Sequence, residues 1–192
     1  MAAKAKELPT LPFESAAAWE RWLAEYHASH DGVWIKIAKK ASGIASTTHD
    51  EALDVALCYG WIDGQRNSLD DHYFLQKFTP RQPRSLWSKR NIEMVTRLTA
   101  EGRMVASGLA QVEAARHDGR WDAAYDSPKN MAVPEDFLKA LEQNPPAKVF
   151  FKTLGKSATF AIGFRLATAK KPETRQRRLA AILAMLERGE FR

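Results

Sequence analysis

Two segments near the middle of the chain are rich in turn residues, tryptophan and cations. The first reads Cys58-Tyr-Gly-Trp-Ile-Asp-Gly-Gln-Arg66, and the second reads Pro80-Arg-Gln-Pro-Arg-Ser-Leu-Trp-Ser-Lys-Arg-Asn91. Gly60 is the residue type that ends a helix in the left-handed conformation, and Pro80 ends a strand because it cannot donate to a sheet ladder. We therefore predict a helix up to Tyr59, antiparallel strands over 61–66 and 72–79, and a helix beginning at Ser85 or Ser88.

The elements before these segments are predicted from capping and periodicity. Ser15 caps a helix to about His27, in which apolar residues recur at helical spacing. Alternation over 33–39 predicts a strand. The pair Thr48 and Glu51 fits a capping box that opens the next helix. The apolar residues of the first helix are Trp19, Trp22, Leu23 and Tyr26.

From Ser85 onward the pattern is helical. The fold class we predict is α+β, with a small, mostly antiparallel sheet and helices in the N-terminal half, packed against an all-helical C-terminal half. We expect one continuous globular unit with a subdomain boundary near Ser85. Its predicted parts are a flexible lead-in over 1–12, an α+β subdomain over 13–84 and a helical subdomain over 85–192. The C-terminal helices are predicted at 105–117, 134–144, 146–154, 157–169 and from Pro172, with Pro134 in a first helical position and Ser157 as a cap.

Composition restricts the class of protein. The chain has 192 residues, 45% of them hydrophobic and 27% charged, which is typical of a globular domain. No window approaches the roughly 18 apolar residues of a membrane span, and the N-terminus does not resemble a secretory signal. A single cysteine, Cys58, suits a reducing compartment. We expect a cytoplasmic protein without membrane insertion.

The net charge of +6 is unevenly distributed, because residues 165–192 hold eight Lys or Arg against three Glu. A basic final helix can bind nucleic acid, but interspersed acids favour a solvated helix face. We expect only weak, non-specific nucleic-acid binding that fades as salt rises.

The second segment is the best candidate for a binding site. It carries Arg81, Arg84, Lys89 and Arg90 near a predicted helix N-terminus, and no acid lies between Asp71 and Glu93. Free backbone N–H groups and arginine forks suit phosphate or carboxylate. The alternative is that these arginines pair with acids of the hairpin and fix the loop to the sheet. The residues of the candidate anion pocket are Trp61, Asp63, Arg66, Arg81, Arg84, Ser85, Trp87, Ser88, Lys89 and Asn91.

Other chemistry is weakly signalled. Asp63 lacks an evident partner for general base catalysis, and Cys58 on an apolar helix is expected to be buried. Trp61, Trp87 and Trp121 either form a stacking pocket or join the sheet to the helical half. The histidines show no metal-ligand spacing, so we expect no metal and no cofactor. The sequence assigns no catalytic residue and leaves open whether the protein is an enzyme.

Four motifs of the chain carry a family resemblance. They are Cys58-x-Gly-Trp-Ile-Asp-Gly, Pro80-Arg-x-Pro-Arg-Ser-x-Trp-Ser-Lys-x-Asn91, Gly119-Arg-Trp-Asp122 and Ala169-Lys-x-Pro-Glu-Thr-Arg-x-Arg-Arg178. These motifs resemble the YdeI/OmdA family, whose name describes bacteriocin-protection proteins that are YdeI-like or OmpD-associated. The resemblance covers nearly the whole chain, and its C-terminal motif matches the family's helical OmdA segment, at about 134–192.

The resemblance implies a soluble bacterial stress or antimicrobial-peptide tolerance factor that acts by binding, with a protein partner as one option. The alternative is an enzyme or sensor for a small anionic ligand held at Arg81, Arg84, Ser85 and Ser88.

Overall fold

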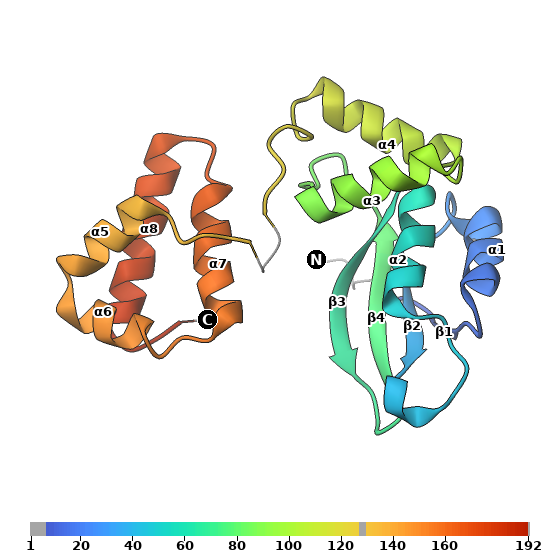
Figure 1. Ribbon diagram of the computed structural model, residues 1–192, viewed down its shortest axis with the longest axis horizontal. Helices are drawn as coiled ribbons and strands as arrows, with labels where there is room; N and C mark the ends of the chain where they lie inside the picture. Colours follow the sequence, from blue (N-terminus) through green and yellow to red (C-terminus); the bar gives the residue numbers. More distant parts are fainter. Residues whose placement is uncertain (1–6, 127–129, 192) are drawn as a thin grey trace, which may run out of the picture. The chain divides into compact units, whose positions relative to one another are not determined.

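The computed structural model describes residues 7–126 and 130–191 (Figure 1). It divides into two compact units, one of residues 1–87 with 91–123 and one of residues 88–90 with 124–192. We call them the N-terminal unit and the C-terminal unit. Their elements are β1 (Thr10–Pro12), α1 (Ala16–Tyr26), β2 (Val33–Ala38), the short 3-10 helix η1 (Lys40–Ser42), α2 (His49–Cys58), β3 (Trp61–Ser68), β4 (Tyr73–Pro80), α3 (Lys89–Ala100), α4 (Ala106–His117), α5 (Glu135–Glu142), α6 (Pro145–Phe151), α7 (Lys156–Ala167) and α8 (Pro172–Glu187).

The N-terminal unit is built on a four-stranded sheet in the order β1-β2-β4-β3. The predicted hairpin is confirmed, since β3 and β4 pair antiparallel, with a register shift between Asp63 and Arg66. We predicted a flexible segment over residues 1–12. This prediction is wrong for its last three residues, because Thr10–Pro12 form a strand parallel to β2. Residues 1–6 lie outside the described residues. The prolines that suggested a lead-in are tolerated because β1 is an edge strand.

One face of the sheet is packed against α1 and α2. On β2, Val33, Ile35 and Ile37 are buried, and Phe78 on β4 meets the ring of Trp19 on α1 at 5.7 Å between centroids. Local signals position both helices as predicted. The Ser15 side chain accepts a hydrogen bond from the Ala18 N–H, and the capping box of Thr48 and Glu51 has both of its bonds.

Helix α3 from Asn91 onward and helix α4 group with the sheet. A side chain at Gly108 on α4 would overlap the Cys58 carbonyl oxygen on α2, so glycine lets these helices approach closely. Arg97 on α3 forms a bidentate pair with Asp54 on α2, at 2.7 and 2.6 Å. The compact N-terminal unit therefore extends beyond the boundary predicted near Ser85. That the two parts form one continuous globular unit stays a prediction.

The C-terminal unit is helical, as predicted, and α8 begins at Pro172. Three predicted starts are wrong, and that of α6 is one of them, because this helix begins at Pro145 and not at Pro146. Pro134 is the N-cap of α5 and does not occupy its first helical position, and α7 begins at Lys156 after Gly155, so Ser157 does not cap it. The core of the unit is formed by Phe137, Leu141, Ala147, Ile162, Leu166, Ile182 and Leu186.

Two arginines of the C-terminal motif have a structural role in this unit. Arg175 donates to the Leu166 carbonyl oxygen at 2.7 Å and forms a bidentate pair with Asp136. Arg178 donates to the Arg165 carbonyl oxygen at 2.6 Å. These bonds reach carbonyl groups in the last turn of α7, where a helix supplies few donors of its own. Part of the positive charge of α8 thus holds the helices together.

The molecule has the predicted α+β class, with its sheet in the N-terminal half and helices alone in the C-terminal half. Among residues 7–126 and 130–191, no helix has the length and apolar character needed to cross a membrane.

Candidate functional site

The residues predicted to form one anion pocket lie in several different environments. Trp61 belongs to the core of the N-terminal unit, where its ring meets Trp19 and Trp22 at 6.3 and 5.9 Å. Its indole N–H donates to the His27 carbonyl oxygen at 3.1 Å. Trp61 is thus a buried structural residue whose polar atom has an internal partner.

Arg81 and Trp87 form the centre of the candidate site. The guanidinium carbon of Arg81 lies 3.7 Å from the centroid of the Trp87 ring, and both side chains are buried. Arg81 Nη1 also donates to the Leu86 carbonyl oxygen at 3.2 Å. Stacking on an aromatic face stabilises a guanidinium group that is removed from water.

The Trp87 indole has an unusual polar environment. Its Nε1 atom is buried and has no hydrogen-bond acceptor within residues 7–126 and 130–191. A buried donor left unpaired costs about 1–3 kcal/mol, and buried tryptophan N–H groups usually find a partner. An acceptor that reached Nε1 would remove this cost, which makes the group a candidate for ligand recognition.

A second tryptophan and two arginines surround this centre. The ring of Trp121 meets that of Trp87 at 5.2 Å, and Arg116 lies over Trp121 at 4.8 Å. Arg120 is buried and donates through Nε to both oxygens of Asp118, while its Nη1 donates to the Ser85 carbonyl oxygen. The Trp87 and Trp121 rings are tilted by 54° rather than stacked, and Trp61 is not part of this cluster.

The loop before Trp87 is a tight turn. The Ser85 N–H donates to the Gln82 carbonyl oxygen at 2.9 Å, and the Ser85 hydroxyl accepts from the Gln82 N–H at 3.1 Å. Arg84 lies inside this turn and is exposed, and Asn91 is half-buried in α3. Ser88 and Lys89 group with the C-terminal unit, where Lys89 pairs with Asp126 at 2.9 Å.

Asp63 and Arg66 lie at the irregularity of β3. The Asp63 carboxylate is 3.2 Å from Nε2 of His49, the first residue of α2. Arg66 donates to the Gln76 side-chain oxygen at 3.3 Å and lies over the Phe74 ring. Sequence reasoning missed His49, because no local signal links residues that only the packing of α2 on β3 brings together. A histidine held by a carboxylate is an arrangement used in acid–base chemistry.

Cys58 is unsuited to nucleophilic chemistry. Its side chain is buried, and burial raises the pKa of the thiol to about 11. At neutral pH the thiolate, which is the reactive form, is therefore strongly disfavoured. Within the part of the chain that the structure describes, no group of three or more His, Cys, Asp or Glu is arranged to hold a metal ion.

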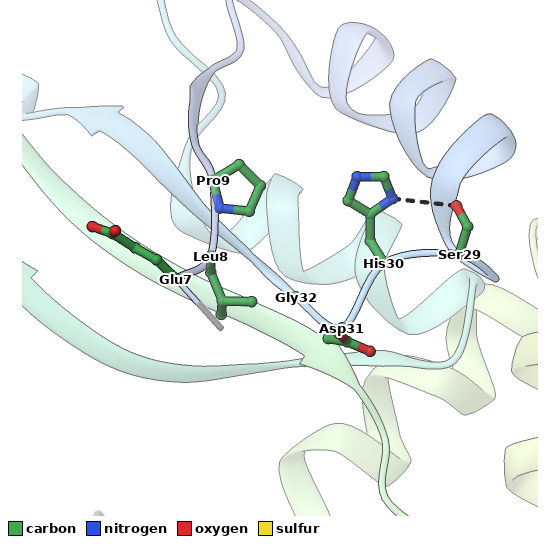
Figure 2. A pocket seen from close by; sticks show the side chains of 7 residues that line it. All are labelled: Glu7, Leu8, Pro9, Ser29, His30, Asp31 and Gly32. Carbon is green, nitrogen blue, oxygen red and sulfur yellow. Dashed lines mark hydrogen bonds between the residues drawn. The ribbon is translucent and has the colours of Figure 1, made fainter. Parts of the chain in front are cut away.

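Figure 2 shows a pocket of about 240 Å³ beside the turn between α1 and β2. His30 in its wall packs edge-on against Trp22 and is 3.2 Å from the Ser29 hydroxyl. The residues that line it are Glu7, Leu8, Pro9, Ser29, His30, Asp31 and Gly32. None of the predicted site residues is among them.

Fold and site define an α+β protein whose N-terminal unit carries a stacked arginine–tryptophan cluster and whose C-terminal unit is a helical module. The chain belongs to a family described as Domain of unknown function (DUF8412), which matches residues 11–111, more than half of its 192 residues. Residues 130–189 match a second family, described as Bacteriocin-protection, YdeI or OmpD-Associated. Comparison with curated proteins gave no match, and neither did comparison with solved structures.

These matches confirm the predicted OmdA resemblance in the C-terminal unit. They do not extend it over nearly the whole chain, because the match that covers the sheet and its helices is to the other family. The centre of the candidate site, Arg81 and Trp87, lies within residues 11–111, whereas the surrounding Arg116, Arg120 and Trp121 lie outside both matched ranges.

Proposed function

We propose that this protein is a bacterial stress or antimicrobial-peptide tolerance factor that acts by binding, in the cytoplasm. The match of residues 130–189 to the bacteriocin-protection family supports this cellular role. The single cysteine suits a reducing compartment.

Charge favours an anionic ligand over direct capture of a cationic peptide. The chain carries a net charge of +6, and like charges repel over the range of a Debye length. A basic protein therefore gains little by binding a basic peptide, whereas phosphate or carboxylate groups are attracted to it.

The molecular activity we propose is recognition of a small phosphate or carboxylate ligand beside Trp87. The observation that carries it is the buried Trp87 Nε1 without an acceptor in the described chain. Arg81 stacks on the same ring and Arg84 is exposed in the adjoining turn, so both cations are close in sequence to this donor. Guanidinium and indole N–H groups are donors only, and the cluster therefore suits binding an acceptor rather than abstracting a proton.

A thermal-shift screen tests the molecular activity. The full chain is heated with orthophosphate and with phosphorylated and carboxylated metabolites, and a ligand of this site raises its unfolding midpoint by mass action. Arg84→Gln should weaken the shift without lowering the stability of the unbound protein. Arg177→Gln changes an exposed arginine of α8 and serves as the matched control. If the thermal shift persists in both Arg81→Gln and Arg84→Gln, the ligand does not bind at this site.

The cellular role has a separate test. Cells lacking the gene are challenged with cationic peptides, then complemented with the natural chain or with Arg84→Gln. We expect the deletion to lower survival and the natural chain to restore it. Unchanged survival of the deletion strain, under conditions where the protein is expressed, would contradict the tolerance role.

A further inference from the structure

The second face of the sheet, opposite the one packed on α1 and α2, carries aromatic and basic side chains. Successive strand residues point to opposite faces, so burial of Val33, Ile35 and Ile37 places Trp34 and Lys36 on the other side. The pairing of β2 with β4 sets Trp34 opposite Lys77 and Lys36 opposite Leu75. We call this surface the outer sheet face and define it by Trp34, Lys36, Tyr73, Leu75 and Lys77, all of them partly exposed.

This face has a distinctive composition. Its five defining residues include two lysines and two aromatic residues and no carboxylate. The Lys36 ammonium lies 4.0 Å from the centroid of the Tyr73 ring. A half-solvated sheet face usually carries polar side chains, so a partly exposed tryptophan on this face is a feature that needs an explanation.

One of the two acids that precede Tyr73 in the chain, Asp70, is engaged in the hairpin turn. Asp70 accepts hydrogen bonds from the His72 and Tyr73 N–H groups, both at 2.8 Å. These bonds, together with the charge of Lys36, lower the pKa of Asp70, which remains a carboxylate at neutral pH. Positive charge is therefore partly compensated at the hairpin end, whereas Lys77 lies farther along β4, opposite Trp34.

The surface next to Lys77 leaves room for a ligand. Gly64 on β3 is exposed, and a side chain there would contact Lys77 at 3.9 Å. Because Gly64 has no side chain, this residue itself does not cover the flank of Lys77. Strands lie about 4.8 Å apart, so Trp34, Lys77 and this uncovered backbone form a short row across the sheet.

We propose that the outer sheet face binds single-stranded nucleic acid. A base stacks on Trp34, and the phosphate groups on either side pair with Lys77 and Lys36. Single strands are bound in this way because every base has an aromatic face and every linkage a negative charge, so the sequence of the strand matters little. A duplex keeps its bases stacked inside and cannot offer one to Trp34. The proposal is independent of the small-anion site at Trp87, since it uses other residues and another ligand.

The test is fluorescence anisotropy of a labelled 12-nucleotide oligo(dT) with the full chain. We expect binding at about 50 mM salt that weakens steeply by about 200 mM, as counterion release requires. Loss of one stacked base corresponds to about 1–3 kcal/mol, so Trp34→Ala should weaken binding by about five-fold to about 160-fold. Trp34→Phe keeps an aromatic face and should retain most of the affinity.

The contribution of charge is tested with a double variant that combines Lys36→Gln and Lys77→Gln. This double variant should weaken binding and flatten the dependence on salt. Lys139→Gln removes an exposed lysine of α5 and is the matched control, with affinity unchanged. Circular dichroism establishes that each variant is folded. Equal affinity of Trp34→Ala, the Lys36/Lys77 double variant and the natural chain would overturn the proposal. The proposal would also be overturned if the chain bound duplex DNA more tightly than single-stranded DNA. A loss of affinity in Lys139→Gln equal to that in the Lys36/Lys77 double variant would overturn it as well.

Discussion

The N-terminal unit contains two groups of tryptophans that differ in how their indole N–H groups are satisfied. In the first group, Trp19 donates to the Ala52 carbonyl oxygen at 3.0 Å and Trp61 to that of His27 at 3.1 Å. In the second group, Trp87 is equally buried, yet its Nε1 has no acceptor in the described residues. Its ring stacks on Arg81 and packs against the tilted ring of Trp121.

This difference separates a structural cluster from a candidate site. Both groups bury large aromatic surface, which stabilises the fold by the hydrophobic effect. Only in the first group do the indole N–H groups also donate hydrogen bonds to backbone carbonyl groups of the protein. A fold rarely keeps an unsatisfied buried donor without a reason, and a ligand acceptor would be such a reason.

The interior beside the first group should exclude solvent from Cys58. This thiol is buried in α2, and its pKa is raised to about 11. At pH 8 the thiolate fraction is accordingly on the order of a hundred-fold below that of a free cysteine. We expect almost no reaction with a coloured thiol reagent in native buffer and full reaction in denaturant. Rapid native labelling would show that this interior opens.

Trp61→Ala should be strongly destabilising. Trp61 is 1% exposed, and truncation leaves a large cavity and an unpaired His27 carbonyl group. We expect a loss of about 3–5 kcal/mol in the free energy of unfolding. Urea unfolding of the full chain measures it. Trp121→Ala is the comparison, and its cost should be smaller because Trp121 is partly exposed.

Replacement by phenylalanine isolates the hydrogen bond. Trp19→Phe removes the donor to Ala52 and should cost about 1–3 kcal/mol. Trp87→Phe removes a donor that has no acceptor in the described chain, so its cost should be lower than that of Trp19→Phe by about 1 kcal/mol. The free energies of unfolding in urea provide the comparison. Equal losses at the two positions would mean that the two indole groups are satisfied alike.

The smallest effect is expected at the exposed end of the second group. Arg116 lies over Trp121 at 4.8 Å and is solvent-exposed. Arg116→Gln should lower the free energy of unfolding by about 0.5–1 kcal/mol, the usual range for an exposed cation on an aromatic ring. Arg116→Lys keeps the cation and should recover part of this loss. Identical stability of the two variants would argue against the interaction.

Local sequence signals predicted much of the fold. The capping box at Thr48, the glycine at position 60 and the hairpin all depend on neighbouring residues, and the structure contains each of them. The strand β1 was missed because Pro9 and Pro12 were interpreted as signs of an irregular segment. Its pairing with β2 depends on residues more than twenty positions away, which periodicity does not detect.

The candidate site was predicted less well, for the same reason. Asp63 and Arg81 were grouped by their proximity in sequence, whereas the structure pairs Asp63 with His49 and stacks Arg81 on Trp87. Contacts such as that between Trp87 and Trp121 arise only when α4 and the loop that follows it pack in the N-terminal unit. Residue types predicted which side chains can bind an anion, and the fold decides which of them meet.

The most direct test of the difference between the two tryptophan groups is a ¹H–¹⁵N spectrum of the indole N–H groups during a titration with orthophosphate or with the best ligand of the thermal screen. Trp→Phe variants assign the resonances of Trp19, Trp61 and Trp87. A ligand that accepts a hydrogen bond from Nε1 should move the Trp87 resonance and leave those of Trp19 and Trp61 in place, because these two already donate to carbonyl groups. If a ligand that stabilises the chain leaves the Trp87 resonance unmoved, or moves that of Trp61 instead, Trp87 is not its recognition group.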